Sequence, residues 1–103
     1  MSTYVSLMKW TEQGIRSARD SVARVEQARQ SIERSGGQLT TVLWTQGAYD
    51  LVAIHEWPDD ESATAFLLGL AMQGNVRTET LRAYTAEEMG RILGKLPEVT
   101  RAT

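Results

Sequence analysis

The feature of this sequence that most constrains its fold is a short glycine-containing connection between two β-rich segments. Residues 38–46 and 49–57 are rich in β-branched and aromatic residues, and only Gly47 and Ala48 separate them. Glycine at the first position of a two-residue loop is typical of a type II′ turn, which joins antiparallel strands with the correct twist. The sequence therefore predicts an antiparallel hairpin at this point.

Segments on either side of the hairpin extend this pattern. Apolar residues recur at three- and four-residue steps from Ile15 to Ile32, which predicts a helix, with a kink near Gly14 and Ser17. The chain reads as strand, helix, strand, strand, helix, strand and a short third helix, over 3–10, 12–35, 38–46, 49–57, 60–73, 76–84 and 86–96. This β-α-β-β-α-β order predicts an α+β, ferredoxin-like fold, in which both main helices cover one face of a four-stranded antiparallel sheet.

Length and composition limit the kinds of protein that this chain can be. A chain of 103 residues predicts one domain over 1–103, with an ordered core at about 3–96 and a tail at 97–103. The net charge of −2 argues against nucleic-acid binding. The absence of cysteine and the single histidine, His55, argue against a metal site. Neither a signal peptide nor a membrane span is predicted, so a cytoplasmic protein is expected.

The hairpin register assigns side chains to the two faces of the predicted sheet. With a two-residue loop, Thr40 lies opposite His55, and opposed residues share a face. Along each strand, alternate positions point to opposite faces. The set of positions that is mainly aliphatic, which includes Val5 and Ile54, is predicted to face the helices. The other set of alternating positions is too aromatic for a solvated surface. It is predicted to form an open face that a second subunit or a ligand covers. Its residues are Tyr4, Ser6, Met8, Trp10, Thr40, Val42, Trp44, Tyr49, Leu51, Ala53, His55, Trp57, Thr80, Arg82 and Tyr84.

Three stretches of the chain resemble the GYD-domain family. They are residues 4–15, the hairpin Gly47-Ala48-Tyr49-Asp50, and residues 74–83. The family takes its name from a Gly-Tyr-Asp sequence, into which this chain inserts Ala48. The resemblance covers roughly residues 3–96 and implies a small bacterial protein related in fold to the dimeric α+β barrels. It supplies no catalytic residues, and fold alone does not fix function.

Three functions fit such a fold with an aromatic open face, and the sequence leaves all three open. The first is a homo-oligomeric protein that binds a small molecule on that face, beneath a second subunit. The second, implied by the broader barrel class, is a cofactor-independent isomerase, cyclase or monooxygenase in which His55 acts as acid or base and Arg82 or Tyr84 stabilises an oxyanion. The third is a purely structural assembly unit.

The candidate site residues come from the predicted open face. His55 is the candidate catalytic residue, because its charge can change near neutral pH. Asp50, at the end of the hairpin, is expected to bond backbone instead. No cofactor is expected; haem ligation by His55 stays open, without a second ligand or a haem motif in support. The expected partners are a second copy of the chain, as a homodimer or higher homo-oligomer, and a small-molecule ligand, but neither nucleic acid nor a membrane. The candidate ligand-binding residues are Trp10, Trp44, Trp57, Arg82, Tyr84 and Tyr4.

Overall fold

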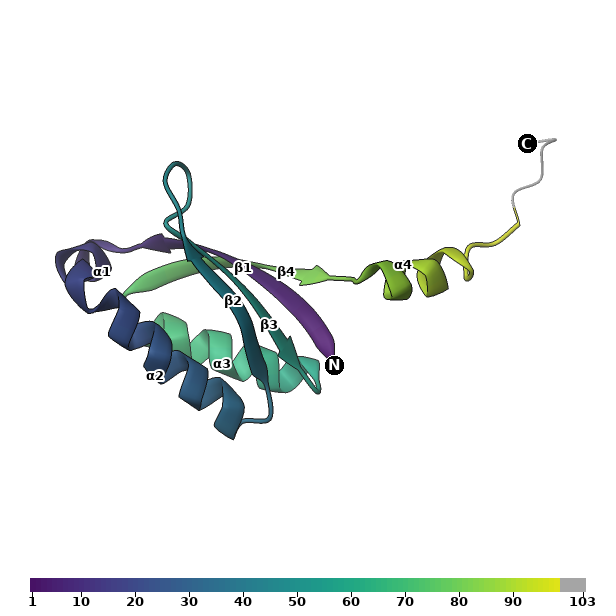
Figure 1. The fold of residues 1–103 in the computed structure, drawn as a ribbon, viewed down its shortest axis with the longest axis horizontal. Coiled ribbons are helices and arrows are strands. Elements are labelled where there is room, and N and C mark those ends of the chain that lie inside the picture. The colour runs from purple at the N-terminus through teal and green to yellow at the C-terminus, as the bar shows by residue number, and fades with distance from the viewer. Residues whose placement is uncertain (99–103) are drawn as a thin grey trace.

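Two long helices cover one face of a four-stranded antiparallel sheet, as Figure 1 shows. This computed structural model describes residues 1–98, so from residue 99 onward the predicted tail lies outside the described residues. The spatial order of the strands is β2-β3-β1-β4. The ferredoxin-like fold predicted from the sequence is therefore confirmed. The strands are β1 Ser2–Trp10, β2 Gln38–Trp44, β3 Leu51–Trp57 and β4 Val76–Ala83, and the helices are α1 Glu12–Arg16, α2 Ser21–Arg34, α3 Asp60–Gln73 and α4 Ala86–Leu93.

The helices begin and end at residues that cap them. Thr11 caps α1 by accepting a hydrogen bond from the backbone of Gly14, and Asp59 caps α3 in the same way from Ser62. Gly74, with φ of 82°, ends α3 in the left-handed conformation that glycine adopts without strain. Between α1 and α2 the chain passes through a 3₁₀ turn, Ala18–Asp20. The kink predicted for this region is therefore confirmed.

The hairpin has the predicted register near its tip but not along its whole length. Trp44 lies opposite Leu51, as predicted, although the strands stop there and leave a longer connection than two residues. Further along, a bulge between Leu39 and Thr41 places Leu39 opposite His55. The predicted pairing of Thr40 with His55 is wrong, because the bulge adds one residue to β2.

Asp50 joins the hairpin to β1 through backbone hydrogen bonds. Its carboxylate oxygen Oδ2 accepts from the backbone N–H of Trp10 at 2.9 Å, and its own N–H donates to the carbonyl of Met8 at 2.8 Å. Gly47, at the tip, has φ of 105°, a conformation that L-residues with a side chain rarely adopt. Asp50 therefore has the structural role predicted for it. Gly47 lies at the turn as predicted, but the prediction of a two-residue loop there is wrong, because the strands end at Trp44 and resume at Leu51.

The two faces of the sheet are the reverse of those predicted from the sequence. The buried positions of β1 are Tyr4, Ser6 and Met8, and those of β3 include His55 and Trp57. All lie on the face that the helices cover. The residues that alternate with these lie on the opposite, open face of the sheet. They are Val5, Leu7, Val52, Ile54, Leu43 and Leu81. Leu43 and Leu81 are 58% and 54% exposed. The open face is therefore aliphatic, and the prediction of an aromatic open face is wrong.

The reason for the reversal lies in the spacing of the two long helices. Each helix contacts the sheet, but α2 and α3 are not packed closely against each other. Large aromatic side chains, such as Trp57 and Phe66, fill part of the space between the sheet and the helices and pack with ring centroids 5.4 Å apart. The aliphatic character of one set of strand positions was therefore not enough to predict which face of the sheet the helices cover.

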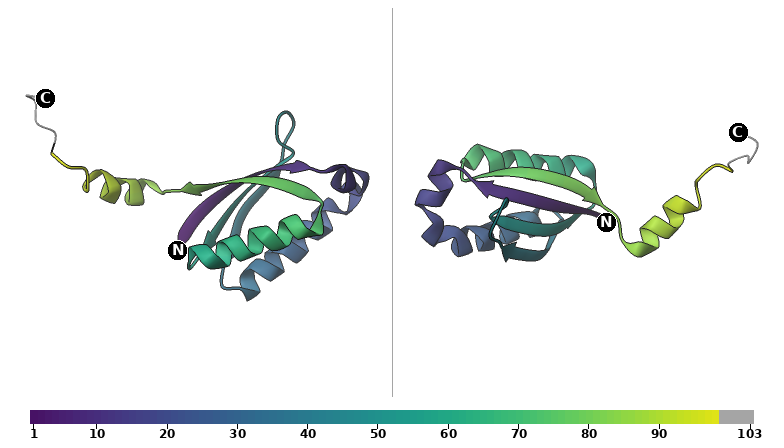
Figure 2. Two further views of the ribbon diagram at one scale, coloured as in Figure 1. Left: turned by 180° about the vertical axis from the view of Figure 1, so that it is seen from behind. Right: turned by 90° about the horizontal axis from the view of Figure 1, so that it is seen from above.

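Helix α4 extends away from the sheet beyond the end of β4, as Figure 2 shows. Its N-terminus has a capping box, formed by Thr85 and Glu88. Of the apolar residues along it, Met89 is 40% exposed and Leu93 57% exposed. This short helix thus presents an apolar stripe that the rest of residues 1–98 does not cover. None of the helices in residues 1–98 combines the length and apolarity needed to span a bilayer.

Candidate ligand-binding cleft

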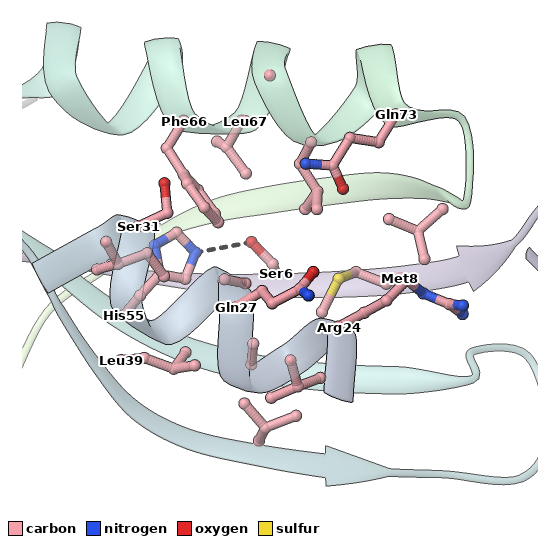
Figure 3. Close-up of a pocket in the computed structure, with 18 of the residues that line it drawn as sticks. Ser6, Met8, Arg24, Gln27, Ser31, Leu39, His55, Phe66, Leu67 and Gln73 are labelled. Carbon is pink, nitrogen blue, oxygen red and sulfur yellow. Dashed lines mark hydrogen bonds between the residues drawn. The ribbon is translucent and has the colours of Figure 1, made fainter. Parts of the chain in front are cut away.

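A cleft of about 730 Å³ lies between α2 and α3, above the helix-covered face of the sheet. Figure 3 shows Ser6, Met8 and His55 on its floor, with Gln27 on α2 and Phe66 on α3 forming its walls. Ligand pockets in proteins commonly have volumes between about 300 and 1,000 Å³. The cleft is therefore large enough for a small molecule.

Small residues on the facing sides of the helices keep this cleft open. Ala28 and Ser31 lie one turn apart on α2, and Ala65 and Gly69 lie one turn apart on α3. A Cβ atom built at Gly69 would meet no other atom within 4 Å. With larger side chains at these positions, the two helices would fill the space between them.

A chain of hydrogen bonds crosses the floor of the cleft from β3 to β4. The indole N–H of Trp57 donates to Nδ1 of His55 at 2.7 Å. On the other side of the imidazole ring, Nε2 lies 2.8 Å from Oγ of Ser6, which in turn lies 2.8 Å from Oγ1 of Thr80. The side chains of His55 and Ser6 are thus both buried and hydrogen bonded.

The bond from Trp57 decides which nitrogen of His55 carries the proton. An indole N–H can only donate, so Nδ1 must be the acceptor and Nε2 must carry the hydrogen. His55 then donates to Ser6 and cannot accept the Ser6 proton. Burial also lowers the pKa of His55 below its ordinary value of 6.5, which favours the neutral ring. The Ser6–His55 pair is therefore not arranged as a nucleophile with its general base.

A second cluster of predicted site residues lies beyond the His55 end of the cleft. The Tyr4 hydroxyl donates to Asp60, and the Tyr4 ring stacks on His55 with centroids 5.8 Å apart. The hydrogen bond to Asp60, followed by burial, raises the pKa of Tyr4 above its ordinary value. The guanidinium of Arg82 lies 5.6 Å from the Tyr4 ring and 4.5 Å from the Tyr84 ring. These contacts fix the end of β4 from which α4 begins.

The structure separates the candidate residues into three groups. His55 and Trp10 line the cleft itself. Trp57 is fully buried behind His55, and Tyr4 packs against the same imidazole. The others lie outside the cleft: Trp44 donates to Ser21 Oγ at 2.9 Å on the side of α2, and Arg82 and Tyr84 lie at the far end of β4.

Most of the lining residues could not be identified from the sequence. Ser6 looks like an ordinary strand residue, and Arg24 and Gln27 look like solvated positions on an amphipathic helix. The available signal was the spacing of small residues, Ala28 with Ser31 and Ala65 with Gly69, on the inner sides of both helices. That spacing would have indicated a gap between the helices.

The residues offer no ready ligand set for a metal or haem iron. Within residues 1–98, no three His, Cys, Asp or Glu side chains lie close enough together to hold a metal ion. Both ring nitrogens of His55 are already hydrogen bonded, so iron ligation there would break one of those bonds.

Comparison with known proteins shows the family to which this chain belongs. The GYD domain family model matches residues 4–93, so the chain belongs to the GYD domain family. One relative, from Thermus thermophilus, is called "Glutamine synthetase and cystathionine beta-lyase binding protein". It is 28% identical over 90 residues, which are 86% of this chain and 95% of the relative. A crystal structure of a protein from Thermus thermophilus matches with a TM-score of 0.52 and 28% identity, over 84% of this chain and 96% of that one.

Proposed function

We propose that this protein is a homo-oligomeric binding protein that takes a small molecule into the cleft between α2 and α3. The observation that carries the proposal is the cleft of about 730 Å³, whose lining combines apolar side chains such as Met8 and Phe66 with polar ones such as His55. Binding sites for small molecules have this composition. The site proposed is thus on the helix-covered face of the sheet, and not on the open face.

Catalysis by His55 has less support than binding. A general base needs a free lone pair within reach of its substrate, and Trp57 occupies the one on Nδ1. The hydrogen on Nε2 is directed to Ser6. His55 is therefore proposed as a fixed polar group on the cleft floor, which orients Ser6 toward Thr80.

The open aliphatic face is the proposed contact between subunits. Val5, Leu7, Val52 and Ile54 form its centre, and Leu43 and Leu81 add exposed apolar side chains at its margins. Monomeric proteins rarely expose a continuous apolar patch of this kind. A second sheet packed on this face would bury it and leave the clefts of both subunits accessible on the outside.

The experiment that tests the cleft is ligand-observed NMR with metabolite mixtures. Binding compounds are expected for the wild type, and Ala28→Phe, which fills the cleft, should abolish their binding. The matched control is Ala71→Phe, which places the same side chain on an exposed part of α3 outside the cleft. The proposal fails if no compound loses its binding in Ala28→Phe relative to Ala71→Phe.

Binding to another protein is a second candidate function. It is supported by the exposed apolar stripe of α4 and by the name of the Thermus relative, which describes a protein that binds two enzymes. A photocrosslinking amino acid at Met89 should link to another protein in cells, whereas the same amino acid at Arg91, on the charged side of α4, should not. Crosslinks from position 89 only to a second copy of this chain would assign α4 to the homo-oligomer and remove this candidate.

A further inference from the structure

Within residues 1–98, the charged side chains that line the cleft are all basic. The whole chain has 13 acidic and 11 basic residues. Among the described residues that line the cleft, however, none is Asp or Glu, whereas Arg24 and Arg34 both line it. A cleft with positive charges and no negative ones, in a protein of negative net charge, favours an anionic occupant.

Arg24 lies at the end of the cleft away from His55, where Figure 3 also shows Gln73. Its Nη1 donates to the carbonyl of Ser17 at 2.8 Å and to Ser17 Oγ at 3.1 Å, which fixes the guanidinium. Within residues 1–98, no carboxylate lies within 4.0 Å of it. Its Nε and Nη2 donors can therefore bind an anion side-on, in the forked geometry that matches a carboxylate.

Trp10 supplies a second donor at the same end of the cleft. It lies opposite Val76, which follows the C-terminus of α3 closely, and both residues line the cleft. The indole Nε1 of Trp10 is buried, and within the described residues no acceptor faces it. A buried N–H without an acceptor destabilises the free protein, so a ligand oxygen that it reaches after a small turn of the indole ring would offset this cost.

We propose that the cleft binds an amphipathic carboxylate, with its carboxylate at Arg24 and Trp10 and its apolar body extending over Met8 toward Phe66. This proposal rests on the cleft being a ligand site, as argued above, and adds the class of ligand and its orientation. One guanidinium and one indole N–H suit a singly charged carboxylate better than a phosphate dianion, which usually requires more donors. Arg34, in the last turn of α2, is exposed at the opposite end.

Isothermal titration calorimetry with matched pairs of acids and amides tests this orientation. The probes are octanoate and 4-phenylbutyrate, each compared with its uncharged primary amide, so that aliphatic and aromatic bodies are tested separately. We expect at least one of the acids to bind the wild type about tenfold more tightly than its amide, because the charged hydrogen bonds form only with the acid. Arg24→Gln should remove this difference without weakening the amide, and Trp10→Phe should reduce it.

Arg34→Gln removes the cleft-lining charge at the other end and should reduce the advantage of the acid less than Arg24→Gln does. Arg91→Gln, on α4 and outside the cleft, is the matched control and should leave both affinities unchanged. Equal affinities for acid and amide, both lost in Ala28→Phe, would overturn the carboxylate assignment while the cleft remained a binding site. A loss in Arg34→Gln as large as that in Arg24→Gln would overturn the orientation. Failure of every probe to bind the wild type would also overturn the carboxylate proposal. The metabolite screen would then test separately whether the cleft binds any small molecule.

Discussion

At the residue scale, His55 is the side chain whose surroundings are most fully specified. It is buried, its Nδ1 accepts from Trp57, and its Nε2 donates to Ser6. These contacts suit the neutral ring only, because protonated imidazole has no acceptor for the indole N–H. The environment of His55 should therefore make the stability of the protein depend on pH.

The first prediction concerns this pH dependence. Because the folded-state pKa of His55 is lowered below 6.5, the unfolded chain binds more protons than the folded chain between those two values. The free energy of unfolding should then fall as the pH decreases below about 6.5 and stay level above it. His55→Gln should lose this component, so urea unfolding between pH 5 and 7.5 should give a smaller pH slope than for the wild type. Equal slopes would contradict the neutral, buried state of His55.

The second prediction contrasts two glycines. A Cβ atom at Gly14 would lie 1.9 Å from the carbonyl oxygen of Asn75, whereas one at Gly69 would meet nothing within 4 Å. Gly14→Ala should therefore lower the free energy of unfolding by about 1–3 kcal/mol, because backbone must move. Gly69→Ala should raise it by about 0.5–1 kcal/mol, because alanine favours the helix. Denaturant titration measures both, and a stabilising Gly14→Ala would contradict the close packing of α1 on the start of β4.

From the sequence, candidate site residues could be selected only by their residue type. His55 is the single histidine and Trp10 is one of three tryptophans, so both were selected by type, and both line the cleft. Ser6 and Arg24 are common residue types at ordinary positions. Their place in the cleft depends on the pairing of strands and on the space between helices, which their types do not encode.

At the element scale, helix ends were predictable because capping is a local interaction. Thr11, Gly74 and the Thr85–Glu88 capping box all act within a few residues of themselves. Which face of the sheet the helices cover was not predictable, because it depends on contacts between distant segments. Tyr4 and Trp57, two large aromatic residues that had been assigned to the open side, are buried beneath the helices. The bulge near Thr40 affects only the start of β2, where it places Leu39 opposite His55.

The third prediction concerns α4, which contacts the rest of the chain very little. Without tertiary packing, a helix this short depends strongly on its cap. Thr85→Ala should therefore destabilise α4 by about 1 kcal/mol, roughly a fivefold loss of amide exchange protection over Met89–Leu93. Thr64→Ala, at an exposed position within α3, is the control and should not change exchange in α4. Unchanged protection in Thr85→Ala would show that something other than the cap holds α4.

At the scale of the whole molecule, the reversed faces change where the subunits are expected to meet. An aliphatic open sheet suits a dry contact with a second copy, whereas the mixed aromatic and polar face lies beneath the helices and forms the cleft floor. We therefore propose that subunits assemble on one side of the sheet and that a ligand binds on the other.

The fourth prediction tests this contact between subunits. The double variant Leu43→Lys, Leu81→Lys places two charges on the open face at side chains that are more than half exposed in the single chain, so its fold should persist. Light scattering should show an oligomer for the wild type and a monomer for the variant, because the lysines would be buried without partners. Met72→Lys, at an 85% exposed position on α3, is the control and should leave the oligomer intact.

The most direct test of the account is a crystal structure of the oligomer grown with octanoate. We expect two sheets packed face to face through Leu7 and Ile54, and octanoate between α2 and α3 with its carboxylate at Arg24. Subunits joined through α2 and α3, with the ligand lying between the two sheets instead, would contradict both the assignment of the faces and the cleft as the binding site.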